Sequence, residues 1–144
     1  MTMKLMLDTS ILARLCQPAF ADVQTWFRSL LERGEGAPEL IVSVIADYEL
    51  RRHLLAIGAD ESLKHLDELV RSLRCVPLNA EASRRAAELR DTLNKGGVTG
   101  ALDPGLLMAA QALIEGAVLV TSDRTLQRIP GIVARDWNEI DPNA

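Results

Sequence analysis

Short apolar runs alternate with longer stretches of helical period along the chain. Largely apolar runs, typical of strands buried on both faces of a sheet, occur at residues 4–7, 40–42, 73–77, 117–121 and, more weakly, 132–134. The stretches between them place apolar residues three and four positions apart, which predicts amphipathic helices. We expect these helices at residues 10–17, 21–33, 44–57, 60–72, 80–94 and 103–115, with one further short helix opening at Ser122 and Asp123.

Capping and turn-forming residues mark the ends of these elements. Ser43 and Asn79 are suited to cap helix N-termini, and Gly58 and Gly116 are suited to end helices. The glycine-rich segment 95–100 predicts a mobile loop beside a site or a plain linker. Strands and helices alternate without a repeat or a break in composition. We therefore predict a single α/β domain over residues 1–144, with three layers, α/β/α, around a central, mostly parallel sheet of four to five strands.

Composition narrows the class of fold and of function. Apolar residues make up 48% of the chain and aromatic residues only 3%, so the core is aliphatic, which suits helices packed on a parallel sheet. The net charge of −4 argues against binding nucleic acid through an overall positive charge, but it agrees with acids gathered in a metal site. Cys16 and Cys75 have no CxxC spacing and are expected to be free thiols. We find no signal peptide and no apolar run near the roughly 20 residues of a membrane helix, so we expect a cytoplasmic protein without membrane contact.

Two acids follow buried strands, and both are candidates for chemistry. Asp8 and Asp123 come at the carboxyl ends of the first and fourth predicted strands, where open α/β sheets bind their ligands. Each acid could instead cap the helix that follows it, although Thr9 and Ser10 already offer capping groups after Asp8. The hydroxyl residues Thr9, Ser10 and Thr121 either orient these carboxylates or serve as ordinary caps. If the two strands are neighbours, the two acids meet in one crevice.

Two further acids are expected at the same edge of the sheet. Asp103 precedes a proline at a helix start, which is a common N-cap arrangement, and the helix N-terminus would also help keep a carboxylate ionised. Glu49 lies inside the predicted helix 44–57, where a capping role does not explain it. It either faces solvent, paired with Arg52 or His53, or projects from the carboxyl edge of the sheet.

Four converging carboxylates would repel one another, and divalent cations would relieve that repulsion. Hard oxygen ligands select Mg²⁺ or Mn²⁺ over zinc, and neither of the two histidines belongs to an HExxH pattern. Such carboxylate sites are typical of phosphodiester chemistry, in which one metal activates water and another steadies the leaving oxygen. A phosphatase or phospho-acceptor domain fits less well, because Ser10 stands where the former would have a second acid.

Four segments in this order, LDTSIL, SVIADYELRR, LDPGLLMAAQAL and VLVTSDRTLQRIPGI, resemble the PIN domain of VapC-type ribonuclease toxins. The resemblance implies a PIN-like fold and a Mg²⁺- or Mn²⁺-dependent endoribonuclease acting on RNA. It further implies that the catalytic and metal-binding acids are Asp8, Glu49, Asp103 and Asp123, supported by Thr9 or Ser10 and by Thr121. An antitoxin protein and a homodimer are the implied partners.

The chain departs from the family pattern at four places, one of which is Arg51-Arg52-His53 after the second acid, where relatives often have a glycine-containing turn. Ala46 stands where many relatives carry threonine, and Asp123 stands where many carry asparagine. Pro104, directly after the third acid, is unusual and bears on how Asp103 points. A non-catalytic PIN-like module that binds RNA or protein is therefore the alternative function.

Apolar surface for a partner is expected on two helices. Trp26 and Phe27 lie on the second helix, and the helix at residues 60–72 is strongly amphipathic. Either helix offers a surface for a homodimer or for an antitoxin helix, unless both faces simply pack on the sheet.

Overall fold

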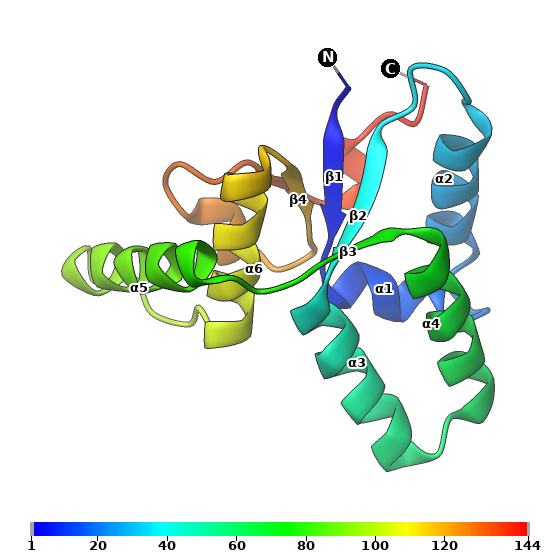
Figure 1. Ribbon diagram of the computed structural model, residues 1–144, viewed down its shortest axis with the longest axis horizontal. Helices are drawn as coiled ribbons and strands as arrows, with labels where there is room; N and C mark the ends of the chain where they lie inside the picture. The colour runs from blue at the N-terminus through cyan, green and yellow to red at the C-terminus, as the bar shows by residue number, and fades with distance from the viewer. Residues whose placement is uncertain (1, 144) are drawn as a thin grey trace.

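The computed structural model describes residues 2–143 (Figure 1). Its strands are β1 (Lys4–Leu7), β2 (Glu39–Ser43), β3 (Arg74–Val76), β4 (Val118–Val120) and β5 (Ala134–Arg135). Its α-helices are α1 (Thr9–Leu15), α2 (Ala21–Glu32), α3 (Val44–Ile57), α4 (Asp60–Ser72), α5 (Ala80–Lys95) and α6 (Asp103–Glu115). Two short 3-10 helices follow, η1 (Leu126–Arg128) and η2 (Trp137–Glu139). The predicted α/β class is confirmed.

All strand pairs in the five-stranded sheet are parallel, and the strand order is β3-β2-β1-β4-β5. The chain therefore builds outward from β1 to β3 on one side and then returns to place β4 and β5 on the other. Leu7 at the end of β1 is in register with Val42 of β2 and Val120 of β4. The carboxyl ends of β1 and β4 thus meet where the strand order reverses, which is where such sheets leave a crevice.

Helices cover both faces of the sheet. In Figure 1, α5 and α6 lie on one side of the central strands, α1, α2 and α4 lie on the other, and α3 extends beyond the carboxyl edge. The strands between these layers are buried on both faces, and Leu5, Met6 and Leu7 of β1 have no exposed surface. This double burial explains why the strand sequences are continuously apolar rather than alternating.

Trp26 and Phe27 are buried, so the expectation that they offer partner surface is wrong. Their side chains are 4% and 8% exposed. The Trp26 indole donates a hydrogen bond to the Ile140 carbonyl oxygen at 2.9 Å and packs edge-on against Trp137 with ring centroids 6.2 Å apart. Packing against the C-terminal segment, which lies more than a hundred positions away in the sequence, covers this helix face.

The predicted caps are confirmed. Ser43 and Asn79 each accept a hydrogen bond from a backbone N–H of the first helical turn, from Ile45 and Ala82 respectively. Gly58 ends its helix with a φ of 67°, a left-handed conformation that a residue with a side chain adopts only at a cost.

Some boundaries differ from the predictions. The fifth strand is Ala134–Arg135 rather than 132–134, because β4 pairs with those two residues. The short helix expected at Ser122 and Asp123 is a 3-10 turn at Leu126–Arg128. Asp123 accepts hydrogen bonds from two backbone N–H groups in this segment, and those bonds shape a turn before the helix begins.

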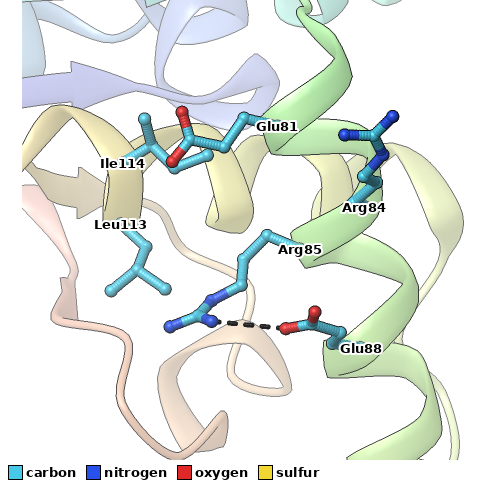
Figure 2. A pocket seen from close by; sticks show the side chains of 6 residues that line it. All are labelled: Glu81, Arg84, Arg85, Glu88, Leu113 and Ile114. Carbon is cyan, nitrogen blue, oxygen red and sulfur yellow. Dashed lines mark hydrogen bonds and ion pairs between the residues drawn. The ribbon is translucent and has the colours of Figure 1, made fainter.

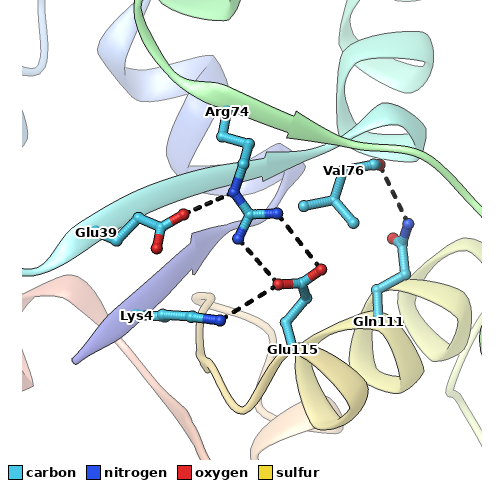
Figure 3. Close-up of polar contacts among 6 residues, drawn as sticks. All are labelled: Lys4, Glu39, Arg74, Val76, Gln111 and Glu115. Atoms are coloured by element: carbon cyan, nitrogen blue, oxygen red, sulfur yellow. Dashed lines mark hydrogen bonds and ion pairs between the residues drawn. The ribbon is translucent and has the colours of Figure 1, made fainter. Parts of the chain in front are cut away.

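An ion-pair network, the amino-edge network, joins the starts of three strands to the end of α6 (Figure 3). Arg74 of β3 donates to Glu39 of β2 at 2.6 Å and to Glu115 of α6 at 2.9 Å. Lys4 of β1 lies 3.6 Å from the same Glu115 carboxylate. The hydrogen bond from Arg74 lowers the pKa of Glu115. Both acids of this network, Glu39 and Glu115, therefore have a cationic partner.

A buried polar contact fixes α6 nearer the carboxyl edge. Gln111, only 2% exposed, accepts a hydrogen bond from the Ser43 hydroxyl and donates one to the Val76 carbonyl oxygen at 3.3 Å (Figure 3). Ser43 also caps α3, so Gln111 links the start of α3 to α6. Such satisfied buried groups set the relative position of the elements they join.

Cys16 is buried and Cys75 half-buried, and both are free thiols, as predicted. Within residues 2–143, none of the helices combines the length and the apolar character that crossing a membrane needs.

Candidate active site

Asp8 lies where the ends of β1 and β4 meet. Its backbone N–H donates to the Val120 carbonyl oxygen at 3.1 Å, which extends the strand pairing to this residue. Its carboxylate Oδ1 accepts hydrogen bonds from the Ile11 N–H at 3.2 Å and from the Ser10 hydroxyl at 2.6 Å. Asp8 therefore caps α1, and the same geometry holds its carboxylate at the crevice.

The Asp8 carboxylate is buried, with 4% of the residue exposed. Burial raises the pKa of Asp8, because an ionised carboxylate loses hydration, while hydrogen bonds from Ser10, Thr121 and the backbone act in the opposite direction. A charged acid in this position is thus costly unless a cation joins it.

Glu49 projects from α3 toward α1, where its partner is a hydroxyl. The Thr9 hydroxyl donates to Glu49 Oε1 at 2.7 Å. The hydrogen bonds and ion pairs of the described residues join Glu49 to neither Arg52 nor His53, the partners that a solvent-facing position would favour. Thr9 therefore orients this acid, in one of the roles expected for the hydroxyl residues beside Asp8.

Asp123 follows β4 and is exposed. Its Oδ1 accepts hydrogen bonds from the backbone N–H groups of Thr125 at 2.8 Å and Leu126 at 3.4 Å. Its own N–H donates to the Thr121 hydroxyl at 3.0 Å. Thr121 therefore contributes at both acids, because its side chain also hydrogen-bonds to Asp8.

Ser10 connects the two strand ends. Its hydroxyl donates to Asp8 and accepts a hydrogen bond from the backbone N–H of Ser122 at 3.2 Å. The segment that carries Asp123 is thereby fixed to the segment that carries Asp8. All three hydroxyl residues predicted to support the acids contact them or hold their surroundings.

Asp8, Glu49 and Asp123 line one cavity of about 410 Å³, which we call the carboxyl-edge cavity. Its other lining residues are Thr9, Ser10, Ala13, Leu50, His53, Leu102, Pro104, Gly105, Met108, Ser122 and Leu126. Among the described residues, none of the three acids takes part in an ion pair. The cavity therefore concentrates negative charge without a cationic side chain to balance it.

Asp103, the fourth predicted acid, is not among the residues that line this cavity, although Leu102 and Pro104 on either side of it are. Its side chain is 83% exposed, and its carboxylate lies 2.8 Å from the Arg90 guanidinium of α5. The N-cap of α6 is Leu102, so the expectation that Asp103 is the N-cap is wrong. The helix itself begins at Asp103, as predicted, and Pro104 lies within its first turn.

The donor set suits a hard divalent cation, because carboxylate and hydroxyl oxygens are the ligands that Mg²⁺ and Mn²⁺ prefer. The hydrogen bonds of Glu49 and Asp123 use one oxygen of each carboxylate. Within residues 2–143, however, no three His, Cys, Asp or Glu side chains already stand together as a metal-binding group. The acids share a cavity, and a cation would have to draw them closer.

A second cavity, of about 540 Å³, lies between α5 and α6 and has a different charge pattern (Figure 2). It is lined by Glu81, Arg84, Arg85, Glu88, Leu113 and Ile114. Arginines and glutamates balance there, and Arg85 lies 3.2 Å from Glu88. The unbalanced acids of the carboxyl-edge cavity are thus a local feature and do not follow from overall acidity.

His53 is a residue that sequence reasoning did not assign to the site. It follows Glu49 by four positions on α3 and lines the same cavity. The spacing alone could have suggested this, because residues four apart lie on one face of a helix.

Comparisons with known proteins agree with this geometry. Residues 5–132 match the family model described as PIN domain. No curated protein matches the chain in sequence.

Solved structures share the fold. A chain in the structure of VapBC2 from Rickettsia felis, bound to a DNA fragment from their promoter, superposes with a TM-score of 0.80 at 24% identity, covering 94% of this chain and 99% of that one. DNA-bound VapBC from Salmonella typhimurium gives a TM-score of 0.77 at 22% identity, with coverage of 94% and 99%. VapBC-1 from nontypeable Haemophilus influenzae gives 0.75 at 24% identity, again with coverage of 94% and 99%.

Proposed function

The chain belongs to the PIN domain family, and on that premise we propose that it is a VapC-type endoribonuclease that cleaves RNA phosphodiester bonds with Mg²⁺ or Mn²⁺. The observation that carries the proposal is the carboxyl-edge cavity, which is lined by Asp8, Glu49 and Asp123 from three separate segments, none of them in an ion pair among the described residues. Stability alone gives no reason to gather acids in this way, because like charges at close range are unfavourable.

Asp8, Glu49 and Asp123 are the proposed metal ligands. A divalent cation, when bound, would supply the positive charge that attracts the phosphodiester and steadies charge developing on its oxygens. The hydroxyl groups hold the acids ready: Ser10 and Thr121 fix Asp8, and Thr9 fixes Glu49. Side chains held by neighbours in this way lose little freedom when the substrate arrives.

Asp103 is proposed to contribute less than the other three acids. Its carboxylate is paired with Arg90 and is not among the groups that line the cavity, so it would have to leave that partner before it could act. The resemblance to the family implies four acids, and the ion pair with Arg90 is the reason to rank this one below the rest.

We propose two kinds of protein partner, an antitoxin and a second copy of the chain. The structures similar in fold come from VapBC complexes. Apolar side chains on one side of α3, those of Val44, Tyr48 and Leu55, are exposed and would suit such a partner. An antitoxin that holds a ribonuclease inactive would do so in the cytoplasm, where the RNA is. Co-purification with a small protein encoded beside this gene, together with inhibition of cleavage, is the expected result.

RNA cleavage by matched acid variants tests the proposed activity. Wild type, Asp8→Asn and Glu115→Gln would be incubated with labelled single-stranded RNA and Mn²⁺. We expect Asp8→Asn to lose about 100-fold or more in cleavage rate, because several kcal/mol of charge stabilisation depend on the site. Glu115 belongs to the amino-edge network, and its variant should cleave like wild type. Equal cleavage by wild type and Asp8→Asn would show that the activity is a contaminant and the proposal wrong.

A non-catalytic PIN-like module that binds RNA or protein is the second candidate. The observation that favours it is the pairing of Asp103 with Arg90, which leaves three acids rather than four in the cavity. A protein of this kind would bind RNA without cutting it, and its melting temperature would not change with Mn²⁺.

A further inference from the structure

The carboxyl-edge cavity poses a problem for an anionic substrate. In the part of the chain that the structure describes, the charged residues that line it are acids, and neither lysine nor arginine lines it. A phosphodiester approaching this cavity meets carboxylates that repel it, and a bound cation would offset only part of that charge. At least one hydrogen-bond donor in the lining is needed to hold the phosphate in place.

Among the described residues that line the cavity, His53 is the one whose side chain carries nitrogen. It lies one helical turn beyond Glu49 on α3, so both side chains project from the same face of the helix toward the cavity. It is exposed, which places its ring at the mouth rather than in the interior. A group in that position meets the substrate as it enters.

The ring of His53 is free of protein partners within the described residues, because none of their hydrogen bonds or ion pairs includes it. The other histidine, His65 on α4, differs, since its Nδ1 lies 3.4 Å from the Cys16 carbonyl oxygen. His65 also lies away from the acids, beside Leu15 and Gln24. The two histidines therefore form a natural pair of test and control residues.

We propose that His53 is a substrate-binding residue, whose imidazole N–H donates a hydrogen bond to a phosphate oxygen of the RNA at the mouth of the cavity. This inference rests on the proposed ribonuclease function and deepens it. It assigns His53 to holding the phosphodiester, and it leaves the bond-breaking step to the acids and the cation. The contact is made by a neutral or a protonated ring alike, because both forms carry an N–H.

Kinetics with His53→Ala, His53→Gln and His65→Ala test the assignment. On mixed-sequence single-stranded RNA with Mn²⁺, His53→Ala should raise KM about tenfold with kcat nearly unchanged, as expected when a hydrogen bond to a charged group is lost from uniform binding. His53→Gln keeps an N–H donor and should recover part of the loss. His65→Ala should behave like wild type.

A binding measurement separates this role from a structural one and from metal ligation. In the Asp8→Asn background, which does not cleave, anisotropy of the same labelled RNA should show about tenfold weaker binding when His53→Ala is added. The Mn²⁺ concentration at the midpoint of the melting-temperature rise, measured with His53→Ala alone, should match wild type. A shifted midpoint would make His53 a metal ligand and overturn the assignment.

Failure of this inference is distinguishable from failure of the proposed function. If cleavage depends on Asp8 but KM and RNA affinity do not change in His53→Ala, the ribonuclease stands and the role of His53 is wrong. If Asp8→Asn cleaves like wild type, the proposed function itself is wrong. Since His53 is exposed, its substitution should leave the melting temperature close to that of wild type, which a melting curve checks.

Discussion

Acids at the two edges of the sheet have different kinds of partner. At the amino edge, Glu39 and Glu115 are each paired with Arg74, and Lys4 adds a second cation (Figure 3). At the carboxyl edge, Asp8, Glu49 and Asp123 accept hydrogen bonds from hydroxyl and backbone groups. The same fold therefore balances charge at one edge and accumulates it at the other.

The difference indicates which edge serves stability and which serves chemistry. Burial raises the pKa of Asp8 at the carboxyl edge, whereas an arginine lowers the pKa of Glu115 at the amino edge. An acid that is costly when ionised, held at a crevice, is typical of a functional site. An acid whose ionised form is stabilised by a paired arginine is typical of a structural contact.

A large loss of activity, comparable to that of Asp8→Asn, is expected for Glu49→Gln. This change removes one charge from the carboxyl-edge cavity and should lower the rate of RNA cleavage about 100-fold, because the cation that completes the site binds more weakly. Gln keeps the acceptor for the Thr9 hydroxyl, so the fold should be retained. Glu88→Gln is the matched control, since Glu88 is paired with Arg85 in the other cavity. Equal losses in both variants would remove the distinction between the cavities.

A smaller effect is expected for the stability of Asp8→Asn, and it is a gain rather than a loss. In metal-free buffer at neutral pH the variant should gain about 1 kcal/mol in free energy of unfolding, because a buried carboxylate is replaced by an amide that still caps α1. Urea denaturation measures this gain.

The pH dependence of that gain follows from the raised pKa of Asp8. Between the ordinary pKa of 3.8 and the raised pKa in the folded protein, the native state holds a proton that the unfolded chain has lost. The wild type therefore loses stability as pH rises through the raised pKa, and Asp8→Asn should lack this loss. Identical pH profiles for the two proteins would contradict a buried, costly carboxylate at the carboxyl edge.

At the amino edge, Glu115→Gln should lower the free energy of unfolding, whereas Asp8→Asn should raise it. The substitution of Glu115 breaks the contacts with Arg74 and Lys4, and the free energy of unfolding should fall by about 0.5–1 kcal/mol, the range for partly exposed ion pairs. The lowered pKa of Glu115 contributes stability above its ordinary value of 4.5, which is lost as pH falls through the lowered pKa. The variant should therefore lose less stability between pH 5 and strong acid, as thermal melts can show.

The smallest effect is expected at the pair of Arg90 and Asp103. Arg90→Gln should change the free energy of unfolding by less than about 0.5 kcal/mol, because the Asp103 side chain is 83% exposed. Asp103→Asn should reduce cleavage less than tenfold. A loss as large as that in Glu49→Gln would return Asp103 to the metal site and restore the four-acid arrangement that the resemblance implies.

The positions of the strand-end acids and of the hydroxyl groups beside them were predictable, but the partner of Glu49 was not. Asp8 follows a short apolar run that predicts a buried strand, and the rule for parallel sheets then places it at the crevice. The contact of Thr9 with Glu49 joins residues forty positions apart, and it depends on how α1 packs against α3. Local pattern carries no information on such contacts.

The predictions that differ from the structure share one physical cause. The pairing of Asp103 with Arg90 follows from the packing of α5 on α6, and the burial of Trp26 follows from the return of the C-terminal segment. The boundaries of β5 were misplaced because the pairing partner in β4, rather than the apolar run itself, defines that strand. Tertiary packing decided each of these points.

A Mn²⁺ titration followed by melting temperature tests most directly whether the unpaired acids at the carboxyl edge hold a divalent cation. A ligand at 100 times its Kd stabilises the native state by about 2.7 kcal/mol, so wild type and Glu115→Gln should melt several degrees higher with saturating Mn²⁺. Asp8→Asn, although more stable without metal, should not respond. An equal rise in Asp8→Asn, or no rise in wild type, would contradict the account.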